Sequence, residues 1–133
     1  MPVYECIIPE GSVAMELRPK IATAFTDIHC NTTGAPRSFV HVIFWDVPDG
    51  TDSGYPDKYY IDGHNRAGRT LEVKETIRQS LVDAFCKISG IDHSKVGSRI
   101  NEAPGGWTME AGHILPNPGE EGPEYYLKEH AAD

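Results

Sequence analysis

Residues 70–90 read TLEVKETIRQSLVDAFCKISG, and this stretch decides the fold of the chain. Its apolar side chains recur every three or four residues, which places them on one face of a helix. They are Val73, Ile77, Leu81, Ala84, Phe85 and Ile88. Thr70 suits the N-cap of this helix, and Gly90 suits its C-cap. The stretch therefore predicts an amphipathic helix.

Short segments rich in strand-forming residues lie on both sides of this helix. Residues 58–62 and 95–101 predict strands, and residues 63–68 predict a turn between the first strand and the helix. A strand, a helix and a second strand of this length require a right-handed crossover, which pairs the two strands in parallel. Residues 57–103 therefore predict one β-α-β unit.

The first part of the chain repeats this order of elements. Residues 2–8 (PVYECII) and 38–46 (SFVHVIFWD) predict strands. Between them, a stripe that includes Ile21 and Phe25 predicts a helix that ends by Gly34. This helix should begin near Met15, because Pro19 is tolerated only in a first helical turn. The helix stripes of the two units lie roughly 55 to 60 residues apart, which indicates a weak internal repeat.

The two units predict a single domain over residues 1–133, of the α/β (α+β) class. Units of about 1–56 and 57–103 would form a four-stranded mixed sheet with both helices on one face, followed by a tail over 104–133. The strand at 38–46 carries large apolar side chains toward both faces of this sheet. Since the face without helices also needs a cover, the sequence predicts that the chain oligomerises.

Charge and composition exclude several kinds of partner. The chain has 12 Lys and Arg against 20 Asp and Glu, a net charge of −8, and the basic residues form no stripe. Nucleic acid and anionic membranes are therefore not expected partners. No apolar run approaches the roughly 20 residues that span a bilayer, and no signal peptide is evident, so a cytoplasmic location is expected. The three cysteines lie far apart and the histidines lack metal-ligand spacing, which predicts buried free thiols and no metal site or cofactor.

Position 2 is the first candidate for chemistry. A small residue after Met1 favours removal of that methionine, which would leave Pro2 as a secondary amine at the start of a strand. Apolar neighbours such as Val3 and Ile7 would lower the pKa of this amine and suit it to general-base catalysis. Taken alone, position 2 is better explained as a residue that simply permits processing.

The segment GHNRAGRT, residues 63–70, is the second candidate, because it carries Arg66 and Arg69 just before a helix. A guanidinium offers paired donors that suit a carboxylate, and the helix N-terminus adds positive potential. A solvated turn in which both arginines pair with acidic neighbours explains the pattern about as well. His29 and Glu110 each have a commoner structural explanation, and the acidic residues at 120, 121 and 124 are typical of a solvated tail.

Together these features resemble the tautomerase superfamily, whose members share an amino-terminal proline and a β-α-β building block. The chain is similar in particular to the cis-3-chloroacrylic acid dehalogenase subgroup, in which two such blocks are fused in one chain. The segments that carry the resemblance are MPVY (1–4), TDIH (26–29), GHNRAGR (63–69), EAP (102–104) and EAGHILPNPG (110–119).

The resemblance implies a role for each matching position. It implies a catalytic proline at Pro2 and a water-activating glutamate at Glu110, and it assigns substrate binding to His29, Arg66 and Arg69. The subgroup's active-site tyrosine falls on Arg99, which adds a third cation and suits a second carboxylate or a different substrate pose. The resemblance also implies a homotrimer that acts on a small carboxylate without a cofactor.

Three functions follow as alternatives. The leading one is an enzyme that interconverts keto and enol forms of a 2-oxo acid, with Arg66 and Arg69 holding the carboxylate and neutral Pro2 moving the proton. The second is a hydratase or cis-3-haloacrylate dehalogenase, in which Glu110 activates water and cationic Pro2 is the acid. Nearby arginines favour a neutral Pro2 and hence the first. The third is a non-enzymatic, cytokine-like binding protein, which a retained Met1 would favour.

Overall fold

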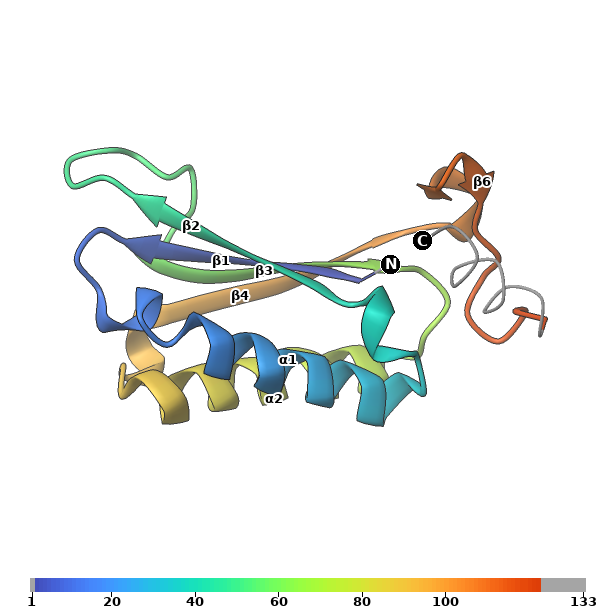
Figure 1. The fold of residues 1–133 in the computed structure, drawn as a ribbon, viewed down its shortest axis with the longest axis horizontal. Helices are drawn as coiled ribbons and strands as arrows, with labels where there is room; N and C mark the ends of the chain where they lie inside the picture. The colour runs from blue at the N-terminus through green and yellow to red at the C-terminus, as the bar shows by residue number, and fades with distance from the viewer. Residues whose placement is uncertain (1, 123–133) are drawn as a thin grey trace.

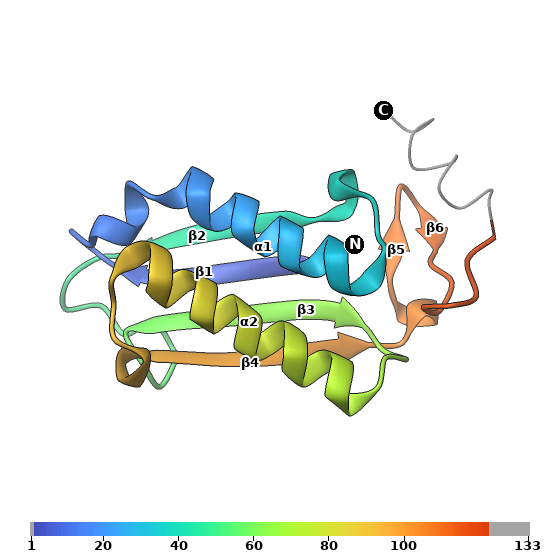
Figure 2. The ribbon, with the colours of Figure 1, turned by 90° about the horizontal axis from the view of Figure 1, so that it is seen from below.

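The computed structural model describes residues 2–122, in which two helices lie side by side against one face of a sheet (Figures 1 and 2). The helices are α1 (Arg18–Thr33) and α2 (Leu71–Ser89). The strands of the sheet, in their spatial order, are β2 (His41–Val47), β1 (Val3–Pro9), β3 (Tyr59–Arg66) and β4 (Val96–Ala103). A hairpin of β5 (Met109–Glu110) and β6 (His113–Ile114) lies beyond one end of the sheet.

Each β-α-β unit contributes one parallel pair of strands. β1 pairs in parallel with β2, and β3 pairs in parallel with β4. The two units join through β1 and β3, which run antiparallel and place Tyr4 opposite Gly63. The predicted four-stranded mixed sheet with two helices on one face is confirmed.

The core lies between the sheet and the helices. Alternate residues of β1 point into it, because successive side chains of a strand face opposite sides of the sheet. Tyr4, Cys6 and Ile8 are fully buried there, and they share one hydrophobic cluster with Phe25 of α1 and Phe85 of α2. Cys6 and Cys86 are buried free thiols, as predicted, whereas the free thiol of Cys30 is only half-buried.

Two element boundaries differ from the prediction. α1 begins at Arg18 rather than near Met15, because Ser12 caps a separate 3-10 turn over Val13–Met15 through a bond from the amide of Ala14. β3 continues to Arg66, where the sequence predicted a turn from residue 63 onward. The extension pairs with β4 as far as Ala103, so tertiary pairing extends a strand that the local sequence does not favour.

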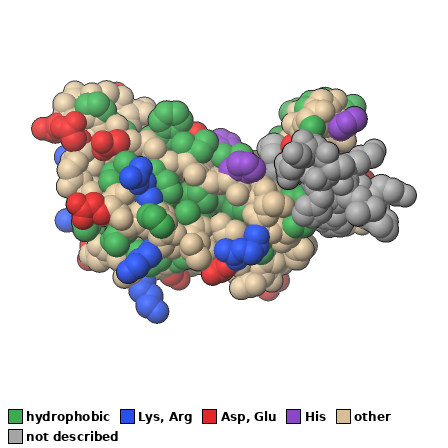
Figure 3. All heavy atoms as spheres, in the orientation of Figure 1, with side chains coloured by type: hydrophobic (Ala, Val, Ile, Leu, Met, Phe, Trp, Pro, Cys, Tyr) green, Lys and Arg blue, Asp and Glu red, His purple; other side chains and the backbone are tan. Residues whose placement is uncertain are grey.

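The face of the sheet away from the helices is uncovered within a single chain. Trp45 and Ile43 on β2 are 51% and 38% exposed. Figure 3 views the molecule from the edge of the sheet formed by β2, and hydrophobic side chains gather across the middle of this side. No helix within residues 2–122 combines the length and apolar character that crossing a membrane requires.

Candidate functional site

A small pocket lies where the chain enters β1. It is lined by Pro2, His29, Ala35, Phe39, Asn65, Arg66 and Arg69. These residues come from the position before β1, the last turns of α1, the connection between α1 and β2, the end of β3 and the segment that precedes α2. The structure thus brings together four of the six residues that the sequence and the resemblance singled out. The pocket has a volume of only about 10 Å³, the space of roughly one water molecule.

Pro2 is buried at the entrance to β1. Its carbonyl oxygen accepts a hydrogen bond of 3.0 Å from the amide of His41, so the residue is tied to the neighbouring strand β2. The pyrrolidine ring also restricts the backbone. Pro2 therefore has a fixed position in the pocket that Arg66 and Arg69 also line.

His29 reaches the pocket from α1 and is only 1% exposed. Its Nδ1 atom lies 2.6 Å from the hydroxyl oxygen of Tyr4. Burial lowers the pKa of His29 to about 3, and the positive charges of Arg69 and Arg66 contribute in the same direction. His29 is therefore neutral at physiological pH, and its buried Nε2 atom has no hydrogen-bond partner among residues 2–122.

The two arginines of the pocket differ in their partners. Arg66 is 8% exposed, and its Nη2 lies 2.9 Å from Oε1 of Glu121, while its Nη1 donates to the carbonyl oxygen of Pro116. Arg69 is half-buried and forms no ion pair with a carboxylate within residues 2–122; its Nη1 lies 3.4 Å from the carbonyl oxygen of Arg66. Burial lowers the pKa of Arg69, and the charge of Arg66 adds to this. Arg69 thus brings a second positive charge to the pocket, which favours binding of an anion.

Glu121 is a component of the site that the sequence did not reveal, because an acidic tail is typically solvated. Its side chain is only 11% exposed in its ion pair with Arg66. Its Oε2 accepts a 2.7 Å hydrogen bond from the amide of Gly119. Burial raises the pKa of Glu121, but hydrogen bonds from backbone amides and from Arg66 outweigh this effect and lower it overall. The chain therefore places its own carboxylate on one of the predicted carboxylate-binding arginines.

Glu110 and Arg99 do not line this pocket within one chain. Glu110 is half-buried on β5, opposite His113 of β6. Arg99 is exposed on the uncovered face of the sheet, where its Nε lies 2.9 Å and its Nη2 3.1 Å from the two carboxylate oxygens of Asp62. The ion pair with Asp62 explains why the Arg99 side chain lies there without any substrate. The assignment of Arg99 to substrate binding therefore stays a prediction.

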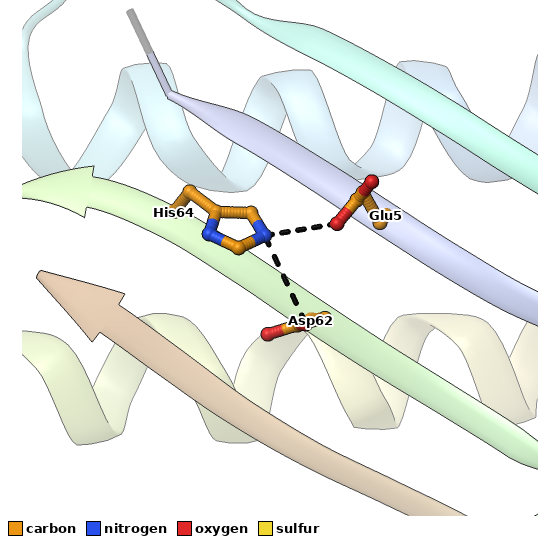
Figure 4. Close-up of side chains that lie close together, drawn as sticks. All are labelled: Glu5, Asp62 and His64. Atoms are coloured by element: carbon orange, nitrogen blue, oxygen red, sulfur yellow. Dashed lines mark hydrogen bonds and ion pairs between the residues drawn. The ribbon is translucent and has the colours of Figure 1, made fainter. Parts of the chain in front are cut away.

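A second polar cluster, Glu5, Asp62 and His64, lies on the uncovered face (Figure 4). Nε2 of His64 is 2.9 Å from Oε2 of Glu5 and 3.8 Å from Oδ2 of Asp62. Asp62 already accepts hydrogen bonds from the guanidinium of Arg99 and from the hydroxyl of Tyr55. Because a guanidinium on the same carboxylate repels a cation, the cluster is better explained as an ion-pair network than as a metal site.

Comparison with known proteins finds similarity at the level of structure. No family model and no curated protein matches the chain. It is similar to the crystal structure of N1, a member of the cis-3-chloroacrylic acid dehalogenase family, with 25% identity, a TM-score of 0.78 and coverage of 98% of this chain and 99% of N1. It is also similar to Pt0534 inactivated by 2-oxo-3-pentynoate, with 23% identity and a TM-score of 0.66. This match covers 86% of this chain and 94% of Pt0534. It is similar as well to an asymmetric trimer of fused 4-OT, with 18% identity and a TM-score of 0.72. This match covers 84% of this chain and 94% of the fused 4-OT chain.

Proposed function

Because the chain has the tautomerase-type fold, we propose that it is an enzyme that interconverts the enol and keto forms of a small 2-oxo carboxylate. One observation carries this proposal. One pocket is lined by Pro2, a neutral His29 and the two arginines Arg66 and Arg69. Of the two arginines, Arg69 has no carboxylate partner among residues 2–122. This arrangement offers a charge for the substrate's carboxylate beside a group that can move a proton.

Arg69 and Pro2 then have distinct roles. Arg69 binds the carboxylate, since a guanidinium can donate two parallel hydrogen bonds to it. The amine of Pro2 is neutral, because burial and two nearby cations disfavour its protonated form. It takes the proton from the C2 hydroxyl of the enol and delivers one to C3. The O–H bond breaks, the C3–H bond forms, and the amine is regenerated. Fixed placement of these groups is the main source of rate enhancement.

Hydration or dehalogenation of a 3-haloacrylate is the second candidate, and the similarity to N1 is the observation that favours it. This reaction needs a carboxylate that activates water and a cationic Pro2. Glu110 is the candidate carboxylate, but it does not line the pocket within one chain. Incubation with each isomer of 3-chloroacrylate decides between the two functions, because only dehalogenation releases chloride.

A homotrimer is the proposed assembly. The uncovered face with Ile43 and Trp45 needs a partner, and fused 4-OT, which is similar in fold, is a trimer. Native mass measurement should give three times the 14.7 kDa of the chain. A monomer at micromolar concentration would contradict this assembly, and Trp45→Glu should weaken it by burying a charge in an apolar contact.

Replacement of Glu121 by Gln is expected to lower the KM for phenylenolpyruvate. The substrate's carboxylate and that of Glu121 compete for the arginines, and Gln keeps the size of the side chain but removes its charge. We expect a decrease of about tenfold, which corresponds to removal of a competitor that occupies the site about nine-tenths of the time. Steady-state kinetics at fixed ionic strength measures the effect.

Glu120→Gln is the matched control for Glu121→Gln. Glu120 is exposed, one residue away, and accepts a hydrogen bond from Asn117 rather than from an arginine. It should leave KM unchanged. A rise in KM for Glu121→Gln would show that Glu121 supports substrate binding instead of competing with it.

Covalent labelling tests the proposed function directly. Pt0534 is inactivated by 2-oxo-3-pentynoate, a carboxylate whose alkyne is conjugated to a ketone. A neutral Pro2 amine should add to the alkyne carbon distant from the ketone. Intact mass should increase by one probe, peptide mapping should locate the adduct on Pro2, and excess 2-oxobutanoate should protect. Absence of an adduct, or an adduct on half-buried Cys30 alone, would refute the proposal.

A further inference from the structure

A series of hydrogen bonds connects β3 through β1 to α1, and two of its three residues, Asn65 and His29, line the pocket. Nδ2 of Asn65 lies 3.3 Å from the hydroxyl oxygen of Tyr4, which in turn lies 2.6 Å from Nδ1 of His29. The three residues are 5%, 0% and 1% exposed. These bonds are therefore shielded from exchange with bulk water.

The direction of these two hydrogen bonds, that is, which group donates in each, follows from the protons that are available. The amide nitrogen of Asn65 can only donate, so the hydroxyl oxygen of Tyr4 accepts from it. The single proton of that hydroxyl is donated to Nδ1 of His29, because it would have no other acceptor among residues 2–122 and a buried donor is nearly always paired. Burial raises the pKa of Tyr4 to about 12 and lowers that of His29 to about 3, so the hydroxyl keeps its proton and the imidazole stays neutral. A neutral imidazole that accepts at Nδ1 carries its own proton on Nε2.

The Nε2 atom is at the other end of the ring from this bond. It is buried and has no hydrogen-bond partner among residues 2–122, and His29 lines the pocket together with Pro2 and Arg69. Buried donors in folded proteins are nearly always paired. An unpaired donor beside a pocket is therefore accounted for by an acceptor that arrives with a ligand.

The ring of Tyr4 is held in place by its neighbours. Gly63 lies directly opposite it on β3, and a Cβ at this position would come within 3.0 Å of Cε1 of the ring. Phe25 contacts the ring edge-on, with 6.2 Å between ring centroids. Absence of a side chain at position 63 thus leaves room for the ring of Tyr4 and for the side chain of Ile100.

We propose that Tyr4 and Asn65 are positioning residues that hold His29 as its Nε2-protonated form and direct this N–H into the pocket. Its acceptor, which rests on the proposed function, is the C2 oxygen of the 2-oxo acid. As Pro2 takes the enol proton, negative charge develops on that oxygen and the hydrogen bond from Nε2 strengthens. The proton stays on His29, and Tyr4, which does not line the pocket, does not touch the substrate.

Nitrogen NMR of the ¹⁵N-histidine-labelled protein tests the protonation of His29 without any substrate. His29→Gln assigns its signals among those of the six histidines. We expect the neutral Nε2-protonated tautomer in the wild type at pH 7, and a mixture of tautomers in Tyr4→Phe. An Nδ1-protonated or charged ring in the wild type would overturn the proposal, and so would an unchanged tautomer in Tyr4→Phe.

Kinetics with phenylenolpyruvate tests the consequence for catalysis. Tyr4→Phe should lower kcat about tenfold, because misdirection of one donor to the developing charge weakens its stabilisation, while KM stays within about twofold because Arg69 binds the carboxylate. Tyr59→Phe is the matched control, since its hydroxyl donates 2.8 Å to Oγ of Ser12, away from the pocket. An equal loss in Tyr59→Phe, or an effect on KM alone, would overturn the proposal.

The NMR and kinetic measurements distinguish failure of the proposed function from failure of the proposed role of Tyr4. If no 2-oxo acid is turned over by the wild type, the proposed function is wrong, and NMR still determines whether Tyr4 controls the tautomer of His29. If turnover is present and the tautomer is unaffected by Tyr4→Phe, the proposed function stands and the role of Tyr4 is wrong.

Discussion

Pro2→Ala is expected to lower kcat/KM for the ketonisation of phenylenolpyruvate by about 100-fold, the lower end of the effect of removing a positioned general base. Alanine is also a small second residue, so Met1 is expected to be removed from the variant as from the wild type. The new amino terminus is a primary amine without a ring, and it loses the fixed position that Pro2 has in the buried entrance to β1. The loss should therefore appear mainly in kcat.

Pro9→Ala is the matched control for this prediction. Pro9 lies at the opposite end of β1, so its replacement removes a proline from the same strand without touching the pocket. Its rate should equal that of the wild type. Intact mass of each variant verifies the amino terminus, and a Pro2→Ala variant as fast as the wild type would remove Pro2 from the mechanism.

Arg69→Ala is expected to raise the KM for phenylenolpyruvate by about 100-fold, because it removes a half-buried cation from the carboxylate-binding position. Arg69→Lys should recover only part of this, since an ammonium cannot form the two parallel hydrogen bonds of a guanidinium. Arg78→Ala is a suitable control, because Arg78 pairs with Glu75 on α2 and does not line the pocket. A KM within twofold of the wild type for Arg69→Ala would show that the carboxylate binds elsewhere.

The same substitution should not destabilise the protein. Burial and the adjacent Arg66 both disfavour the charge of Arg69, which has no carboxylate partner among residues 2–122. Its removal therefore relieves repulsion and breaks no ion pair. Thermal unfolding should give a Tm equal to or above that of the wild type. This combination of lower activity and unchanged stability is characteristic of a residue kept for function.

The helix α2 and the sheet could be predicted because their signals are local. Thr70 accepts a bond from the amide of Val73, and Gly90 adopts φ of 76° as the C-cap, so both helix ends are at the predicted residues. The β-α-β order then determines which strands pair in parallel. Convergence of Pro2, His29 and the two arginines follows from this topology, although their roles came from the resemblance.

The features of the fold and the site that could not be predicted from the sequence depend on contacts between residues far apart in the chain. β3 extends to Arg66 because β1 and β4 pair with it, and no apolar alternation marks residues 63–66 as a strand. Glu121 reaches Arg66 across 55 positions, and its acidic neighbours gave no sign that it would be buried. Tyr4 was predicted only as part of a strand; its bond to His29 depends on how α1 packs across β1.

The central claim is that a free amine at Pro2 moves the proton. It is tested most directly by the rate of phenylenolpyruvate ketonisation in two preparations of the same sequence, one that begins at Pro2 and one made by semisynthesis with Met1 retained. In the second preparation the nitrogen of Pro2 is an amide, which has no basicity. We predict activity in the first and at least a 100-fold loss in the second, as for loss of a general base. Equal rates in both would contradict the claim.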